Sequence, residues 1–259
     1  MNRRDYWNRD YADYWKKVTD EAEAGEGRDS RVEKLSGHDF KAPGIKESTS
    51  FFDKIKYDKT DKILDFGCGL GRFFPYFSDR GDYYGIDISQ AMIDECKRRF
   101  PDNGDRFVVS EGESLPFEDG FFRVVVCKGV FDACYQERAL LEMIRVCSVG
   151  GAILISGKND RYFLDDEEAY VAEVNARKKG HPNYFTNVKG MLAQVTPFCE
   201  VVCERYALRR GDFGQGVFIG DIPDRFYEWE IIFRKNHNFT GRFSKFSEEC
   251  SKTWREIQI

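Results

Sequence analysis

The segment ILDFGCGLGR, residues 63–72, joins a short apolar run to a loop with glycine at every second position. The apolar run over residues 62–66 is typical of a strand that is buried on both faces. Glycines between a strand and a helix let the backbone turn tightly and approach a ligand closely. The segment therefore predicts a strand, a ligand-binding turn and then a helix over about residues 70–79, with Pro75 near the start of that helix.

The same alternation of strands and helices continues to residue 156. Ser89 is a good N-cap for the next helix, and Gly150 and Gly151 end the one after it. Further strands are expected at residues 83–86, 106–110, 121–127 and 152–156, and a further helix at 137–147. This rhythm predicts an α/β protein with a doubly wound, mostly parallel sheet.

The rhythm changes after Gly157. Residues 158–196 are polar and helical in character, and two β-rich runs at 199–208 and 226–234 predict an antiparallel pair at the sheet edge. We expect three parts along the chain. They are an N-terminal helical cover (1–50), a ligand-binding domain (51–235) with a substrate-covering insertion at 158–196, and a polar C-terminal tail or helix (236–259).

Composition excludes several classes of protein. Hydrophobic residues make up 41% of the 259 residues, enough for a packed core. A formal net charge of −5 disfavours a strongly basic nucleic-acid binder. We expect no membrane segment and a cytoplasmic location, since no apolar run approaches roughly 18 residues and no signal peptide is visible. The cysteines and histidines are not clustered, so no metal site is expected.

Asp87 follows Gly67 by twenty residues and ends the second predicted strand. In a doubly wound sheet, a carboxylate at this position can accept hydrogen bonds from both hydroxyls of a ribose. The loop and this acid together predict a nucleotide-like ligand. The glycine spacing is G-x-G-x-G rather than the dinucleotide pattern G-x-G-x-x-G, so an NAD-dependent oxidoreductase is disfavoured.

Four segments resemble the class I S-adenosylmethionine-dependent methyltransferases: LDFGCGLG (64–71), YGIDISQAM (84–92), EGESLPF (111–117) followed by FFRVVV (121–126), and the helix end RVCSVGG (145–151). Two departures stand out. Glu111-Gly112 replaces the usual Asp-Ala, and Ser148-Val149 replaces Lys-Pro. The resemblance implies a Rossmann-like fold with a seven-stranded sheet, an antiparallel edge strand, and extra helices at the N-terminus and after strand five. It also implies that S-adenosyl-L-methionine is the cofactor and S-adenosyl-L-homocysteine the product.

The resemblance implies a role for individual residues of these segments. Gly67, Cys68 and Gly69 would lie against the methionine part of the cofactor, whose amino and carboxylate ends Asp65 and Arg72 would hold. Asp87 would bind the ribose, and Ile88 and Met92 would pack on the adenine. Gly112 and Glu113 would meet the adenine edge, Glu111 would accept from its amino group, and the backbone of Lys128 would approach the amino group of the cofactor.

The catalytic residues are less well defined. His181, Tyr135 and Asp132 are candidates, but a surface histidine and helix-capping roles explain them equally well. An oxygen acceptor benefits from a general base, whereas a neutral amine does not need one before attack. Among the N-terminal aromatics, Tyr6, Tyr11 or Trp15 either line a lid over the cofactor or pack on the core.

We expect a methyltransferase that acts on an O or N atom of a small-molecule metabolite, as a monomer or homodimer, without nucleic acid, membrane or metal. Two alternatives stay open. One is a protein or tRNA methyltransferase, against which stand the net charge and the sequence KGVF at 128–131 in place of an N-P-P-[FYW] motif. The other is a non-catalytic sensor or scaffold that binds S-adenosylmethionine.

Overall fold

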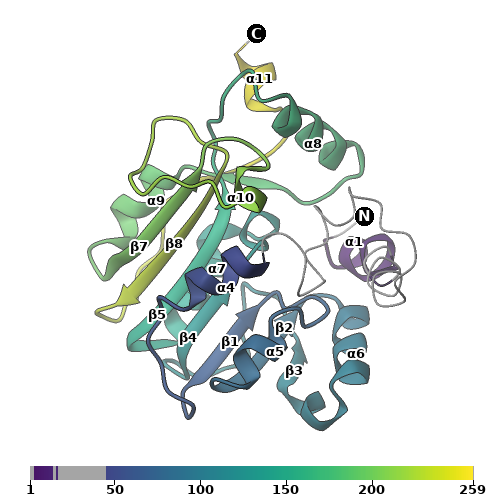
Figure 1. Ribbon diagram of the computed structural model, residues 1–259, viewed down its shortest axis with the longest axis vertical. Coiled ribbons are helices and arrows are strands. Elements are labelled where there is room, and N and C mark those ends of the chain that lie inside the picture. Colours follow the sequence, from purple (N-terminus) through teal and green to yellow (C-terminus); the bar gives the residue numbers. More distant parts are fainter. Residues whose placement is uncertain (1–2, 14–15, 17–44, 259) are drawn as a thin grey trace.

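The computed structural model describes residues 3–13, 16 and 45–258, so the prediction for Trp15 lies outside the described residues. Figure 1 shows a central twisted sheet with helices packed on both of its faces. The N-terminal helix α1 (Arg3–Tyr6) continues into a π-helical turn η1 (Trp7–Tyr11) that lies against α6 (Gln90–Arg99).

The sheet has seven strands in the order β3-β2-β1-β4-β5-β8-β7. Their bounds are β1 Lys62–Phe66, β2 Asp82–Asp87, β3 Phe107–Val109, β4 Phe122–Cys127, β5 Cys147–Lys158, β7 Cys199–Ala207 and β8 Glu228–Lys235. The first five strands are parallel, and β8 runs antiparallel to both of its neighbours. The predicted fold is therefore confirmed, with the strand order reversing at β1, where such sheets bind ligands.

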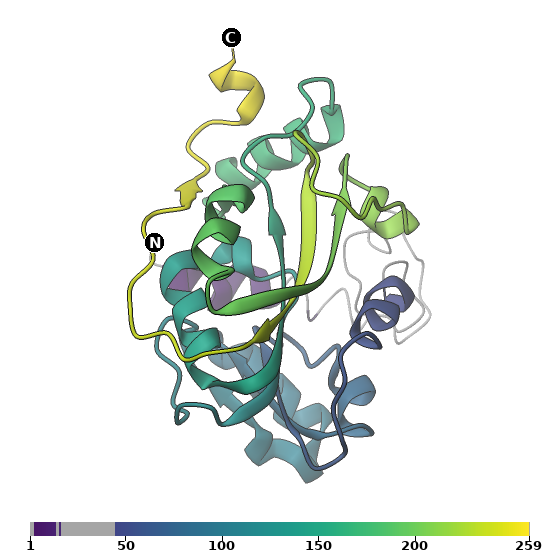
Figure 2. The same cartoon turned by 90° about the vertical axis from the view of Figure 1, so that its left-hand side faces the viewer.

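Two apolar layers sandwich the sheet, because neighbouring residues of the central strands point to opposite faces. Leu64 and Val125 pack with α7 (Gln136–Val146) and α9 (Val188–Val195). Ile63 and Val124 pack with α4 (Ile45–Phe52), α5 (Phe74–Ser78) and α6 on the other face (Figure 2). In the described part of the chain, no helix has the length and apolar character needed to cross a membrane.

The helix predicted over residues 70–79 begins only at Phe74. Gly67, Gly69 and Gly71 have φ angles of +79°, +53° and +75°, which a right-handed helix does not allow. The glycine-rich loop is therefore longer than predicted, and Pro75 lies in the first turn of the shorter helix, where proline is tolerated.

The insertion at residues 158–196 combines helices with a strand that the sequence pattern does not predict. It contains α8 (Glu167–Lys178) and α9, but also a short strand, β6 (Tyr184–Thr186), that pairs with β9 (Ser247–Glu249) of the C-terminal segment. Such a strand depends on a distant partner rather than on local periodicity. The last described helix is α11 (Trp254–Ile257). Thr253 and Glu256 form a capping box at its N-terminus.

Candidate active site

The glycine-rich loop is held rigidly against the end of β2. The backbone N–H groups of Gly67 and Cys68 both donate to the carbonyl of Ile86, at 2.8 Å each. A Cβ atom on Gly67 would lie only 2.5 Å from a methyl group of Val130, so glycine is required there for packing as well as for its positive φ. The loop therefore presents bare backbone to the space above the carboxyl ends of β1 and β4.

Asp87 connects this loop to the next helix. One carboxylate oxygen accepts from Gly69 N at 3.0 Å, and the other accepts from Ser89 N at 2.9 Å. Burial raises the pKa of Asp87 above its ordinary value, although these backbone donors oppose the rise. Each carboxylate oxygen has two lone pairs, so the side chain can still accept two hydroxyl groups from the cavity.

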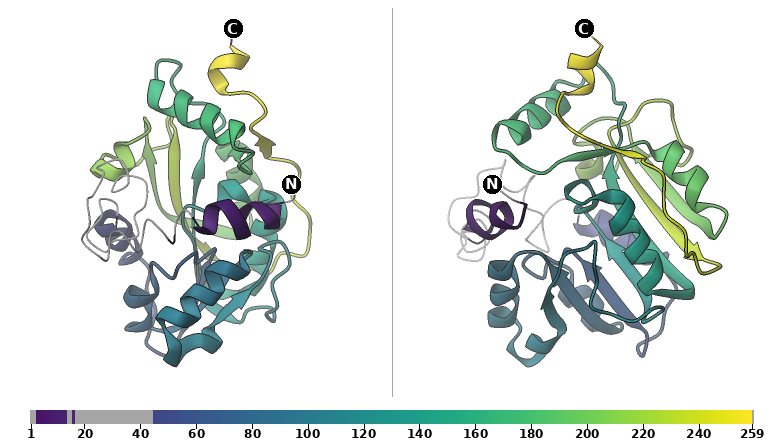
Figure 3. Two further views of the ribbon diagram at one scale, coloured as in Figure 1. Left: turned by 90° about the vertical axis from the view of Figure 1, so that its right-hand side faces the viewer. Right: turned by 180° about the vertical axis from the view of Figure 1, so that it is seen from behind.

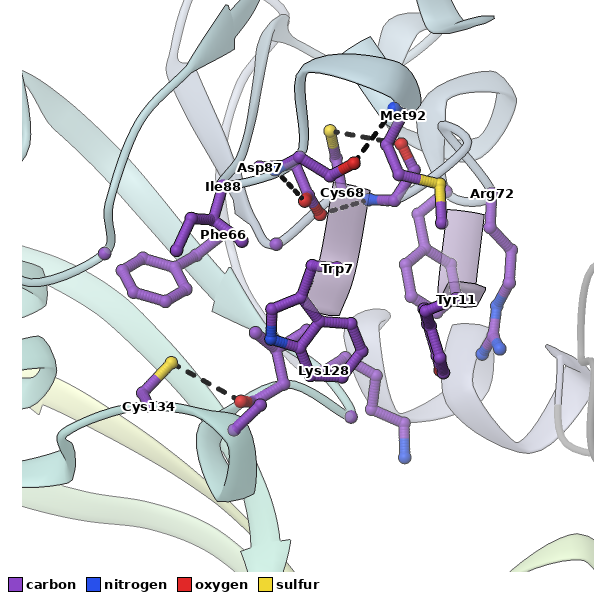
Figure 4. A pocket seen from close by; sticks show the side chains of 18 of the residues that line it. Trp7, Tyr11, Phe66, Cys68, Arg72, Asp87, Ile88, Met92, Lys128 and Cys134 are labelled. Carbon is purple, nitrogen blue, oxygen red and sulfur yellow. Dashed lines mark hydrogen bonds between the residues drawn. The ribbon is translucent and has the colours of Figure 1, made fainter. Parts of the chain in front are cut away.

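A cavity of about 870 Å³ opens at this edge of the sheet. Most of the residues predicted to bind the cofactor line it: Tyr11, Gly67, Cys68, Gly69, Arg72, Asp87, Ile88, Met92, Gly112, Glu113 and Lys128. Figure 4 shows the labelled side chains of this set converging from η1, the glycine-rich loop, β2 and the end of β4. The structure thus brings residues from the separate sequence motifs into one site.

Two predicted residues do not line the cavity. Asp65 is 2% exposed and accepts a hydrogen bond from the hydroxyl of Tyr83 at 2.9 Å. Burial raises the pKa of Asp65 to about 7, with Tyr83 and Arg72 opposing the rise. Glu111 lies outside the cavity, half exposed, in an ion pair with Arg4 at 3.0 Å. Asp65 is thus buried in β1, just before the glycine-rich loop, and Glu111 lies on the outer surface.

Arg72 lines the cavity with an unsatisfied donor. Its Nε atom is buried and has no hydrogen-bond partner among the described residues. Burial lowers the pKa of Arg72 to about 10, and the nearby Asp65 opposes that change. A buried guanidinium donor without a partner costs free energy, and the positive charge of Arg72 in the cavity wall favours an anionic group there.

The N-terminal segment forms part of the cavity wall. Trp7 and Tyr11 line it, and Arg3 forms an ion pair with Glu113 on the opposite rim. The side chain of Asn8 accepts from the Ser89 hydroxyl at 3.1 Å, next to Asp87. Figure 3 shows α1 beside the end of α6, with which η1 is in contact. These contacts hold the N-terminal segment against the cavity.

The three catalytic candidates lie outside the cavity wall. His181 packs among the N-terminal aromatics, its Nδ1 3.0 Å from the Tyr6 hydroxyl, and burial lowers its pKa. Asp132 pairs with Lys158 at 2.9 Å; burial acts to raise its pKa, but this cation outweighs burial and the pKa is lowered. Tyr135 is 48% exposed, and its ring packs against the Arg3 guanidinium.

One side of the cavity is not predicted by the sequence pattern. It is formed by Glu168 of α8, by Arg210 just before α10 (Asp212–Gln215), by Phe213 within α10, and by Glu228, the first residue of β8. Glu228 pairs in register with Lys158, the last residue of β5, because β8 runs antiparallel. Its place at the ligand-binding edge follows from the strand order, which no local pattern specifies.

Comparison with known proteins identifies the central part of the chain. A family profile described as a methyltransferase domain matches residues 64–155. These residues are a methyltransferase domain. The cofactor of this domain is S-adenosylmethionine, as the resemblance implied.

Curated relatives share the methyltransferase domain but differ in what they act on. The chain is 42% identical over 87 residues to an 18S rRNA (guanine-N(7))-methyltransferase of Bos taurus, covering 33% of this chain and 27% of that protein. It is 35% identical over 103 residues to a ubiquinone/menaquinone biosynthesis C-methyltransferase of Coxiella burnetii, and the match covers 36% of this chain and 41% of that protein. The chain thus matches less than half the length of either relative.

The fold matches solved structures over a larger share of the chain than the sequence matches the curated relatives. A TehB-like S-adenosylmethionine-dependent methyltransferase from Corynebacterium glutamicum is 18% identical, with a TM-score of 0.53 over 88% of this chain and 97% of that one. A Haloferax volcanii putative methyltransferase, solved in complex with the methyltransferase activator Trm112, is 17% identical. Its TM-score is 0.56, and the match covers 82% of this chain and 100% of that one. At these identities the similarity concerns the fold alone.

The methyltransferase domain of this chain has the features that its cofactor requires. Asp87 lines the cavity and has lone pairs left to accept two hydroxyl groups, and the cationic Arg72 in the same wall suits a carboxylate. Gly112 lines the cavity, and the Phe66 ring packs so closely on its backbone that a Cβ there would lie 2.1 Å from the ring. The residues present therefore fit S-adenosylmethionine.

Proposed function

We propose that this chain transfers a methyl group from S-adenosylmethionine to an O or N atom of a small molecule. One observation carries the proposal. The cavity that contains the cofactor motifs extends beyond them to a wall formed by α8, α10 and β8, all outside the matched domain. A concave space next to the cofactor motifs, with an aromatic ring and a few charged groups in its wall, suits a small acceptor.

The residues have separable roles in this reaction. Arg72 and the backbone of the glycine-rich loop would hold the amino-acid end of the cofactor, and Asp87 its ribose. The bound cofactor supplies a methyl group on a sulfonium, an already activated leaving group. The protein must then align the acceptor with that carbon and exclude water, which is the role we assign to Trp7 and Tyr11.

The proposal is tested first by calorimetric titration with S-adenosylmethionine, S-adenosylhomocysteine and NAD. We expect micromolar binding of the first two and none of NAD. Asp87→Ala should lose that binding while keeping its circular dichroism spectrum, because the ribose hydroxyls lose their acceptor. Binding of NAD alone by the folded protein would refute the cofactor assignment.

The rRNA methyltransferase relative supports a second candidate, a macromolecular acceptor. The net charge of −5 weighs against it, since RNA binding depends strongly on basic surface. Incubation with methyl-labelled cofactor and either total RNA, protein extract or a small-metabolite fraction separates the candidates. Label in the metabolite fraction supports our proposal, and label in RNA or protein overturns it. Tight binding without label in any fraction would favour a sensor or scaffold.

A further inference from the structure

Glu228 lies in the same cavity as the residues proposed to bind the cofactor. It is the first residue of β8 and pairs with Lys158 at the end of β5 and with Ala207 at the end of β7. Because β8 is antiparallel, its beginning lies at the edge where the parallel strands end. Glu228 therefore shares the cavity wall with Lys128, which directly follows β4.

The Glu228 carboxylate has no hydrogen bond or ion pair with any residue that the structure describes, although cations surround it. The Lys128 ammonium is paired with Glu230 instead. The Arg210 guanidinium donates to the Tyr227 hydroxyl at 3.0 Å, and that hydroxyl donates in turn to Glu173. The third neighbouring cation, Lys158, pairs with Asp132 at 2.9 Å. All three cations thus interact with other groups, which leaves the carboxylate of Glu228 available to a ligand.

The surroundings of Glu228 increase its basicity. Burial raises its pKa, and the cations Arg210, Lys128 and Lys158 oppose the rise, while Asp132 reinforces it. A carboxylate with a raised pKa is a better proton acceptor near neutral pH. Glu168 adds a second acidic group at the solvent-exposed rim of the same cavity. The same cavity wall thus carries two acidic side chains, Glu168 and Glu228.

We propose that Glu228 binds the ammonium group of an amine acceptor and takes its proton. The amine nitrogen transfers one proton to a carboxylate oxygen of Glu228. Its freed lone pair forms the new nitrogen–carbon bond while the carbon–sulfur bond of the methyl donor breaks and leaves its electron pair on sulfur. The proton on Glu228 then passes to solvent. This inference rests on the proposed function and names its substrate class as small amines with an apolar portion, which Phe213 in the same wall would contact.

The test uses three probes of similar size that share a phenyl ring: benzylamine, benzyl alcohol and benzoate. Each is titrated by ligand-observed NMR into the protein saturated with S-adenosylhomocysteine. We expect benzylamine to bind roughly tenfold tighter than either of the others, because the carboxylate stabilises the ammonium by a charge-assisted hydrogen bond. Glu228→Gln should remove that preference, and binding of S-adenosylhomocysteine should stay unchanged.

Glu200→Gln is the matched control, since Glu200 is a half-exposed glutamate on β7 that pairs with Arg234 and does not line the cavity. It should keep the preference for benzylamine. Equal or tighter binding of benzoate would overturn the proposal in favour of an acid held by Arg210. No benzylamine binding, or binding that Glu228→Gln leaves intact, would also overturn it. Failure of S-adenosylhomocysteine to bind would instead refute the proposed function.

Discussion

Substituting Asp65 by asparagine tests the electrostatics beneath the glycine-rich loop. Asp65 is buried in β1 and accepts a hydrogen bond from the hydroxyl of Tyr83. Its pKa is raised from 3.8 to about 7, with burial as the largest cause. Asparagine has nearly the same shape and keeps an acceptor oxygen for the Tyr83 hydroxyl, but it cannot ionise. The variant therefore isolates the free-energy cost of a charge at this position.

The magnitude follows from linkage between protonation and folding. Between pH 3.8 and about 7 the folded state holds a proton on Asp65 that the unfolded state has released. The stabilisation from the raised pKa is thus complete below pH 3.8 and is lost as the pH rises through about 7. A difference of about 3 pH units at 1.36 kcal/mol each gives roughly 4 kcal/mol. Relative to the wild type, Asp65→Asn should therefore gain about 4 kcal/mol between pH 4 and pH 8.

Urea unfolding of the ligand-free protein, followed by circular dichroism at pH 4, 5, 6, 7 and 8, measures this difference. An exposed aspartate, Asp79, supplies the control variant Asp79→Asn, which removes one negative charge without changing a buried group. The stability difference between Asp65→Asn and the wild type should grow steadily with pH and level off above about 7. A difference that is flat over this range would refute the reasoning, since it would mean that burial does not penalise the ionised carboxylate.

Three further substitutions give distinct signatures. Gly112→Ala places a Cβ 2.1 Å from the Phe66 ring, so we expect about 1–3 kcal/mol lower stability and weaker cofactor binding; an unchanged urea midpoint would contradict this. Arg72→Met removes a buried unsatisfied donor, so the free protein should gain roughly 1 kcal/mol while S-adenosylhomocysteine binds less tightly; both are measurable by thermal melting with and without ligand. Lys235→Met leaves two buried carbonyls at the end of α7 without their donor and should cost about 1–3 kcal/mol in urea unfolding, with cofactor affinity unaffected.

The cofactor side of the site was predictable because its signals are local. The apolar run of β1 and the glycines after it lie within a few residues of the turn they form, and the acid that ends β2 follows Gly67 at the twenty-residue spacing expected in a doubly wound sheet. Ser89 likewise accepts from the N–H of Met92 as an N-cap should. Buried parallel strands and helix caps depend on nearby residues, so a single sequence carries enough information to find them.

The other side of the cavity was not predictable from periodicity. Glu228 and Arg210 reach it only because β8 inserts between β5 and β7 in reversed direction. Strand order and direction depend on the packing of whole layers. The same reason explains the missed strand β6, which forms by pairing with β9 about sixty residues later in the chain. His181 lies within the predicted substrate-covering insertion at 158–196. Its ring packs on the N-terminal aromatics Tyr6 and Trp7, a contact between distant segments that local sequence does not specify.

The reversed strand has a consequence for how such an enzyme changes its selectivity. Residues 64–155 build the part of the cavity with the cofactor motifs, whereas α8, α10 and β8 build the facing wall from later residues. The connection between β7 and β8 leaves and re-enters the sheet beside its outer strand, away from β1 and β2. Its length and composition can therefore change without altering β1, β2 or the glycine-rich loop, and its contact with the cofactor motifs is through Phe213, whose ring lies against Lys128. A single ancestral donor site can in this way serve a series of descendants that differ in acceptor.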